Sequence, residues 1–376
     1  MSMKKEDRIQ TLLFEGVKAG VYPGAVLLVA QEGRIVFLRE AGHRLLNPNA
    51  EPMHKDTIFD LASLTKPLAT TLAIMKLVDQ GNLHLDQALV DLLPGPIPRD
   101  KRALTPRLLL THSAGFLDWK PFYFELDRFR IKERKSVLRK RLLDLPLVYK
   151  PGDGTLYSDL GFMILEWVVE VRGSIPMHIF LNSHFYGLLS LKKTFLSNRG
   201  SEPLFGKDQF AATEDCPWRK RIVLSDVHDE NAYAVGGYSG HAGLFGTAED
   251  AYTLVNLLRS HFFGERSDYL KPETVREFFT LQGLVEGSTW ALGWDTPSPG
   301  NSSSGKYFSK KSVGHLGFTG TSIWIDLERD VVVIFLTNRI HPTRNNEKIK
   351  AFRPRLHDLI MEELGIIDDC LLTNDY

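Results

Sequence analysis

The chain is poor in the features that mark several large classes of protein. Its 376 residues include only two cysteines, Cys216 and Cys370, which excludes a disulfide framework and shows no metal-site spacing. Neither sign of charge is in excess, because 46 basic residues balance 46 acidic ones. No stretch approaches the roughly 18 apolar residues of a membrane-spanning helix. We therefore expect no nucleic-acid partner and no membrane insertion.

The N-terminus also lacks the uninterrupted apolar run of a secretory signal. Five of its first eight residues are charged, and the amphipathic segment that follows contains Glu15 and Lys18. We expect a cytoplasmic location, or a periplasmic one if a leader has been removed. The hydrophobic content of 43% is ordinary for a globular protein, and the length is sufficient for a large core and two lobes.

Hydrophobic patterns predict strands near both ends of the chain and helices between them. Helices are expected over residues 6–19 and about 347–364, and residues 63–284 are expected to be mostly helical. The expected strands are 24–31, 34–39, 290–295, 321–326 and 331–338. This order predicts an α/β fold of the α+β type, in which both chain ends build an antiparallel sheet that is flanked by helices.

A mostly helical lobe is expected to be inserted between the two halves of that sheet. We predict a sheet domain from residues 1–62 and 285–376 and a helical domain from residues 63–284. The active site is expected to lie between them.

The most informative segment is Ser63-Leu64-Thr65-Lys66, an S-x-x-K arrangement at the start of an apolar helix. Residues three apart share a helix face, so the Ser63 hydroxyl can meet the Lys66 amine. A serine is a weak nucleophile until a base takes its proton, which a deprotonated lysine could do. Pro67 donates no backbone hydrogen bond, which indicates that the helix begins near Ser63 and leaves its N–H free for an anion.

Tyr157 is a candidate partner for this pair. It lies on a turn-rich loop just before a helix expected over residues 160–171, which Ser158 or Asp159 could cap. The positive charge of a nearby lysine would favour the phenolate form of Tyr157. A Tyr–Lys pair beside the serine would then supply the base that the nucleophile needs.

A third segment, residues 314–322, carries three glycines directly before a strand. Glycines at this spacing indicate that another part of the backbone approaches closely. An edge strand lying along the site could offer the N–H of Phe318 as a second oxyanion donor beside that of Ser63.

In this order and at these separations, Ser63-Leu64-Thr65-Lys66, Tyr157-Ser158-Asp159 and His315-Leu316-Gly317 resemble the motifs of the serine β-lactamase/penicillin-binding-protein superfamily. The branches that it resembles most are class C β-lactamases, D-Ala-D-Ala carboxypeptidases and family VIII carboxylesterases. Residues 109–116 and 236–250 resemble two further segments of the family. The resemblance implies a Ser63 acyl-enzyme, Lys66 and Tyr157 as the proton-transfer pair, an oxyanion hole from the N–H groups of Ser63 and Phe318, and no cofactor.

Two residues depart from the family pattern. Asp159 stands where the family usually has an asparagine, so a substrate amide would lose a hydrogen-bond donor and meet a carboxylate. His315 stands where the family often has a lysine, which replaces a fixed charge with a group that titrates near neutrality. We expect Asp159, His315 and Gly317 to contact the substrate, and we expect poor recognition of a β-lactam carboxylate.

Two further features have competing interpretations. His228 and His241 could suggest a metal site, but their spacing matches no zinc motif, so we predict no metal and a loop, with His241 on it, that shapes the substrate pocket. Basic residues crowd positions 128–141 and could form an anion-binding patch. Because the whole chain is neutral, a solvated helix face is favoured.

These observations predict a serine hydrolase that acts on small-molecule carboxylic esters, with weak activity on β-lactams. The alternatives are a β-lactamase, a D-Ala-D-Ala carboxypeptidase, an α/β-hydrolase that uses Ser113, and a non-catalytic binding protein of the same fold. The segment around Ser113 lacks the first glycine of G-x-S-x-G. The presence of Ser63, Lys66 and Tyr157 together argues against the binding protein. The sequence carries no sign of an oligomeric state.

Overall fold

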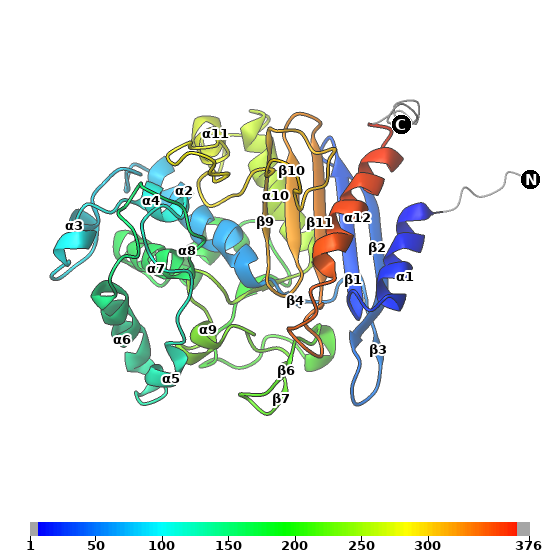
Figure 1. Ribbon diagram of the computed structural model, residues 1–376, viewed down its shortest axis with the longest axis horizontal. Coiled ribbons are helices and arrows are strands. Elements are labelled where there is room, and N and C mark those ends of the chain that lie inside the picture. The colour runs from blue at the N-terminus through cyan, green and yellow to red at the C-terminus, as the bar shows by residue number, and fades with distance from the viewer. Residues whose placement is uncertain (1–6, 367–376) are drawn as a thin grey trace, which may run out of the picture.

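The computed structural model describes residues 7–366, so Cys370 lies outside the described part of the chain. Its centre is a six-stranded antiparallel sheet in the order β3-β2-β1-β11-β10-β9 (Figure 1). The strands are β1 (Gly24–Gln31), β2 (Arg34–Leu45), β3 (Glu51–Pro52), β9 (Ser312–Leu316), β10 (Ser322–Asp326) and β11 (Val331–Thr337). Since β1 pairs with β11, the two ends of the chain meet in the middle of the sheet, as the sequence predicted.

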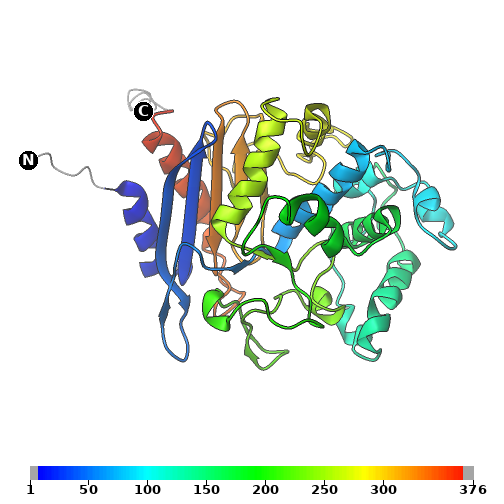
Figure 2. The ribbon, with the colours of Figure 1, turned by 180° about the vertical axis from the view of Figure 1, so that it is seen from behind.

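Helices cover both faces of this sheet, which explains why β1 and β11 are apolar along nearly their whole length. Helices α1 (Arg8–Lys18) and α12 (Ile349–Glu363) pack on one face, where they bury Leu27 and Val29. Alternate residues of β1, Val26 and Leu28, point to the other face. There α10 (Ala248–Phe262) lies against β1 and β11 (Figure 2).

The remaining helices form a lobe beside β9. The apolar helix α2 and the helix α7 pack against each other inside it. The helices of this part are α2 (Leu72–Asp79), α3 (Leu89–Leu92), α4 (Pro106–Leu110), α5 (Tyr123–Leu126), α6 (Ile131–Asp144), α7 (Asp159–Gly173), α8 (Met177–Leu181), α9 (Glu230–Ala234) and α11 (Pro272–Phe278). Its short strands are β4 (Phe59–Asp60), β5 (Phe195–Leu196), β6 (Asp215–Cys216), β7 (Arg221–Ile222) and β8 (Leu244–Gly246).

Two details differ from the sequence-based expectations. Residues 290–295 do not form a strand, because the chain turns at Gly293, where φ is +74°, and Trp290 pairs back onto Asp295. The edge strand is instead β9. The segment 63–284 also contains short strands and the sheet-covering helix α10, so a clean division at its ends stays a prediction.

The basic segment has a structural explanation. Four of the six lysines and arginines of helix α6 form ion pairs with nearby acids, for example Arg141 Nε at 2.7 Å from Glu125 and Arg134 Nη1 at 2.9 Å from Asp127. These pairs favour the helix-face interpretation over an anion-binding patch. Among residues 7–366, no helix has both the length and the apolar character that crossing a bilayer requires.

Candidate active site

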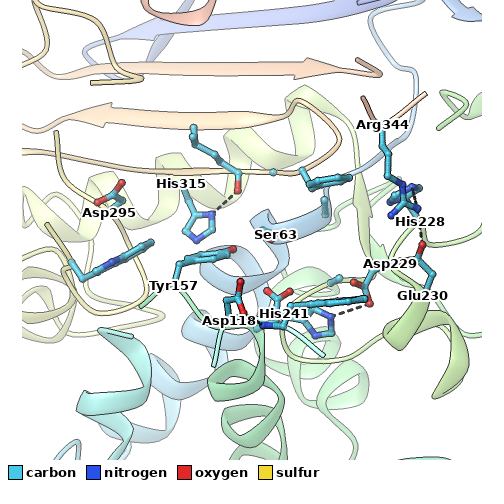
Figure 3. Close-up of a pocket in the computed structure, with 18 residues that line it drawn as sticks. Ser63, Asp118, Tyr157, His228, Asp229, Glu230, His241, Asp295, His315 and Arg344 are labelled. Atoms are coloured by element: carbon cyan, nitrogen blue, oxygen red, sulfur yellow. Dashed lines mark hydrogen bonds and ion pairs between the residues drawn. The ribbon is translucent and has the colours of Figure 1, made fainter. Parts of the chain in front are cut away.

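A cavity of about 660 Å³ opens between the end of β9 and the helical lobe. Seven of the residues that the sequence predicted to act in catalysis or substrate binding line it, and the eighth, Lys66, lies buried behind them. The seven are Ser63, Tyr157, Asp159, His241, His315, Gly317 and Phe318. Figure 3 shows Tyr157 and His315 on one side of Ser63 and Arg344 on the other.

Local hydrogen bonds hold Ser63 at the entrance of its helix. After β4 the chain passes through Ala62, whose φ of +48° is unusual for a residue with a side chain, and enters a 3₁₀ turn over Ala62–Leu64. The buried Asp60 carboxylate stabilises this bend, since it accepts hydrogen bonds from the N–H of Ala62 at 2.9 Å and of His228 at 2.6 Å. A π-helical turn over Lys66–Thr71 then leads into α2.

Lys66 is the centre of the hydrogen-bond network. Its Nζ lies 3.0 Å from Ser63 Oγ, 2.6 Å from Tyr157 OH and 2.6 Å from Asp159 Oδ1. An ammonium has three N–H donors, so these three acceptors satisfy it completely. The structure therefore brings Lys66 into contact with both Ser63 and Tyr157, although Tyr157 lies 91 positions further along the chain.

Charge and burial set the resting protonation of this network. Burial lowers the pKa of Lys66, but the charge of Asp159, together with Tyr157 and the hydrogen bonds to both, raises that pKa above its ordinary value. The ring of Tyr157 faces the cavity, but its hydroxyl lies deep in the protein, and burial raises the pKa of Tyr157 more than the Lys66 charge lowers it. The Lys66 charge acts in the direction expected from the sequence, but burial outweighs it, and both shifts favour an ammonium at Lys66 and a neutral phenol at Tyr157 in the resting network.

Two backbone N–H groups at the cavity are free to bind an oxyanion. Within residues 7–366, neither the N–H of Ser63 nor that of Phe318 donates a hydrogen bond. The turn that carries Phe318 is tied to the segment before Ser63, because Thr319 Oγ1 donates to Asp60 O at 2.9 Å and Thr321 Oγ1 donates to Leu61 O at 3.2 Å. Donors held in this way need no rearrangement when charge develops between them.

Gly317 is required by this close approach of two backbone segments. A Cβ atom at this position would collide with Thr321 Oγ1 and lie 2.8 Å from Leu61 O. Any side chain there would push the Phe318 turn away from Ser63. The glycine that the sequence assigned to substrate binding thus also shapes the oxyanion site.

His315 is buried, with 3% of its surface exposed, and behaves differently from the expectation. Burial, reinforced by the charge of Lys66, lowers the pKa of His315 to about 3, so it does not titrate near neutrality. Its Nδ1 lies 2.9 Å from Leu316 O and must carry the proton there. Nε2 is then a lone-pair acceptor, and it has no partner among the described residues.

His241 and Asp229 form a second ion pair in the wall. His241 Nε2 lies 3.0 Å from Asp229 Oδ1, and the Asp229 charge raises the pKa of His241 even though burial lowers it. Ligand atoms of Asp159, Asp229 and His241 lie within 4.8 Å of one another, a spacing that a metal could use. The Lys66 ammonium already neutralises Asp159, however, and Asp229 is committed to His241 and to the N–H of Ala232. The absence of a metal stays a prediction.

The segment with His228, which the sequence analysis expected to shape the substrate pocket, also lines the cavity through His228, Asp229 and Glu230. Sequence reasoning missed Asp118, Trp119, Trp290, Asp295 and Arg344. These five belong to no recognisable motif, so only the fold brings them together. His112 did carry a signal, because it lies in the family-like segment 109–116. Its Nδ1 accepts the N–H of Ser158 at 3.0 Å, and its ring packs against Tyr157 at 4.7 Å between centroids.

Ser113, the nucleophile of the α/β-hydrolase alternative, is not part of the cavity. Its side chain is buried, and its Oγ donates to Thr111 O at 3.1 Å. The parallel sheet of that fold is absent from residues 7–366. Neither feature supports this alternative.

Comparisons with known proteins agree with the motifs. The family model described as Beta-lactamase matches residues 9–354. The chain is 30% identical over 374 residues to an N-acetylmuramyl-L-alanine amidase of Bacillus subtilis (strain 168), covering 90% of this chain and 82% of that protein. It is 31% identical over 379 residues to a putative D-alanyl-D-alanine carboxypeptidase of Salmonella heidelberg (strain SL476), covering 92% and 85%.

Solved structures share the fold at lower identity. EstCE1, described as a hydrolase with promiscuous acyltransferase activity, superposes with a TM-score of 0.71 at 22% identity and covers 92% of this chain and 97% of its own. A penicillin-binding protein homologue from Pyrococcus abyssi gives a TM-score of 0.73 at 19% identity, covering 96% and 78%. These similarities establish the architecture around the cavity.

Proposed function

The chain belongs to the Beta-lactamase family of serine hydrolases, and from this premise we propose that it cleaves carboxylic esters through an acyl-enzyme on Ser63. The observation that carries the proposal is the contact of Lys66 Nζ with Ser63 Oγ, Tyr157 OH and Asp159 Oδ1. It couples a nucleophile to a proton-transfer pair at the wall of a cavity that has two free N–H donors.

The proposed reaction begins when the Lys66–Tyr157 pair has lost one proton. The pair then takes the proton of Ser63 Oγ, which attacks the ester carbonyl carbon. Negative charge moves onto the carbonyl oxygen, between the N–H groups of Ser63 and Phe318. The bond to the alcohol oxygen breaks, and the pair returns the proton to the departing alcohol. A water molecule then attacks the carbonyl carbon of the acyl-enzyme while the pair takes its proton. The bond between this carbon and Ser63 Oγ breaks, the pair returns the proton to Ser63, and the carboxylic acid leaves.

The charges in the cavity wall favour ester substrates that carry no carboxylate. Asp159 is bound to Lys66 and offers no donor to a substrate amide carbonyl. Arg344 is held by Glu214 and by Glu230, each at 2.6 Å, so its charge is already neutralised. Among the described residues lining the cavity, no cation is left to bind the carboxylate of a β-lactam or a D-Ala-D-Ala peptide.

A second candidate function is hydrolysis of an amide. It is favoured by the names of the relatives, an amidase and a putative carboxypeptidase. A neutral Tyr157 beside Ser63 would be suited to protonate a departing nitrogen, which amide cleavage requires and ester cleavage does not.

Steady-state kinetics on three substrates separates the two. We expect kcat/KM to fall in the order short-chain p-nitrophenyl ester, cephalosporin, D-Ala-D-Ala peptide. The first and last should differ by at least about 10³, since each missing charged hydrogen bond costs about 1.5–3 kcal/mol. Asp159→Asn should narrow this gap. A peptide or penicillin that is turned over as well as the ester would replace the esterase with an amidase or carboxypeptidase.

A further inference from the structure

The wall of the cavity is rich in carboxylates, and they differ in how they are neutralised. Five line it: Asp118, Asp159, Asp229, Glu230 and Asp295. Three of them have a basic partner: Asp159 pairs with Lys66, Asp229 with His241, and Glu230 with Arg344. Asp118 and Asp295 have no basic side chain within ion-pair distance among residues 7–366.

Asp295 is the better placed of these two. Its backbone pairs with Gly314 through two hydrogen bonds of 2.8 Å, which fixes it against the edge strand that carries His315. Its Oδ1 accepts hydrogen bonds from Thr289 Oγ1 at 2.6 Å and from the N–H of Thr296 at 2.9 Å. Its Oδ2 accepts none from the described residues, and burial without a cation raises the pKa of Asp295 to about 6. Its Oδ2 therefore lacks a donor, and the carboxylate lacks a counter-charge, among the described residues.

The same end of the cavity holds a second acceptor without a donor. His315 Nε2 is buried and unpartnered, and its lone pair stays available because the ring remains neutral. Figure 3 shows His315 and Asp295 on the same side of the cavity, away from Arg344. The ring of Trp290 lies 6.0 Å from that of His315 and stacks with that of Tyr157 at 5.8 Å.

This chemistry fits one kind of group. A primary ammonium carries three N–H donors and a positive charge, so it supplies what Asp295 Oδ2 and His315 Nε2 lack. The face of an indole ring also attracts a cation. A neutral alkyl group at this place would give neither acceptor a donor while it excludes water from them, and a carboxylate would be repelled.

We propose that the substrate carries a primary ammonium group, which binds at the end of the cavity formed by Asp295, His315 and Trp290. The inference rests on the proposed function, because it names the class of ester that the Ser63 site takes: an amino-ester. Asp295 acts here as a specificity-determining residue and takes no part in the bond-breaking steps.

Two pairs of esters with matched shapes test the proposal. In p-nitrophenyl 3-aminopropanoate and p-nitrophenyl butanoate, an ammonium replaces a methyl group on the acyl side. In 4-(aminomethyl)phenyl butanoate and 4-ethylphenyl butanoate, the same exchange is on the alcohol side. The readout is the ratio of kcat/KM for the amine over the alkyl ester, since intrinsic reactivity cancels when this ratio is compared between wild type and Asp295→Asn.

Asp295→Asn should lower the ratio at least about tenfold in one of the two pairs, as expected for one charged hydrogen bond. Asp118→Asn is the matched control, because it removes the other unpaired carboxylate from an exposed place in the same wall. An unchanged ratio in both pairs would overturn the proposal. An equal fall of the ratio in Asp118→Asn would also overturn it, because it would show that the ammonium responds to the overall negative charge of the cavity and not to Asp295. If the wild type hydrolyses none of the four esters, the proposed function fails and the inference falls with it.

A measurement on the wild type alone guards against a variant that does not fold. Butylammonium should inhibit hydrolysis of p-nitrophenyl butanoate competitively, at a concentration at least about tenfold lower than 1-butanol does. Equal inhibition by the two compounds would contradict the ammonium site while leaving the esterase activity in place.

Discussion

The ion pair between Lys66 and Asp159 controls when the proposed base becomes available. The side chain of Lys66 is fully buried and that of Asp159 is 17% exposed, with 2.6 Å between Nζ and Oδ1. Asp159→Asn keeps the shape of the side chain and an oxygen that can accept from Lys66, but it removes the negative charge. The ammonium form of Lys66 loses stabilisation, and the pKa of Lys66 must fall.

The size of this fall follows from the charge that is removed. An opposite charge within about 4–6 Å shifts a pKa by about 1–3 units. Because the amide oxygen can still accept from Lys66, we expect the low end of that range, about one pKa unit or about 1.4 kcal/mol. Since Lys66 and Tyr157 share protons, this shift belongs to the pair and not to either residue.

The assay is the pH dependence of kcat/KM for p-nitrophenyl butanoate. In wild type, activity should rise with pH as the pair loses a proton; in Asp159→Asn the rising limb should lie about one pH unit lower. Asp118→Asn, which changes an exposed carboxylate of the same cavity, should leave the limb in place. A rising limb that does not move in Asp159→Asn, or that moves to higher pH, refutes the assignment of the pair as the base.

Three further predictions concern the pair, the oxyanion site and acid stability. Lys66→Ala and Tyr157→Phe should each abolish most of the activity, and the double variant should be little worse than the worse single one; additive losses would show that one residue only supports the fold. Phe318→Pro removes an N–H and should lower kcat about 10²–10³-fold, whereas Phe318→Ala keeps the N–H and should retain most of kcat; equal losses would contradict the oxyanion role. Burial lowers the pKa of His315 and of His357 to about 3, so the unfolded chain binds more protons below the ordinary value of 6.5. The free energy of unfolding should therefore fall as pH drops from 6.5 towards 3, by about 1.4 kcal/mol per pH unit for each histidine. In urea unfolding measured at several pH values, His357→Leu should remove one such contribution. If the dependence of the unfolding free energy on pH is the same in His357→Leu as in wild type, the prediction is contradicted.

Much of the fold could be predicted because its signals are local. The apolar runs of β1 and β11 are visible in a few neighbouring residues, and they led to the prediction of a sheet built from both chain ends. The strand β9 was harder, since Ser312–Leu316 has no strong apolar alternation and is a strand only because it pairs with β10. Residues 290–295 misled for the opposite reason: their apolar side chains pack around a turn at Gly293.

The site divides in the same way. Ser63 and Lys66 lie one helical turn apart, so their contact could be predicted from spacing. Tyr157 was a candidate from its loop before a helix, and the family resemblance implied its role beside Lys66. The charge states could not be predicted, because they depend on burial and on distances that arise only on folding. His315 illustrates this. From the sequence its pKa was expected to be near neutrality, but burial in the fold lowers that pKa and keeps the ring a neutral hydrogen-bond acceptor. Asp295 belongs to no motif, and only its backbone bridge to Gly314 brings it to the edge strand that carries His315.

Covalent labelling tests the central claim most directly. The protein is incubated with a broad serine-reactive fluorophosphonate, its intact mass is measured, and the labelled peptide is mapped. If Ser63 is the nucleophile, wild type gains one label on the peptide that contains Ser63, and Ser63→Ala gains none. Labelling at Ser113, or a Ser63→Ala protein that is labelled as well as wild type, would contradict the account.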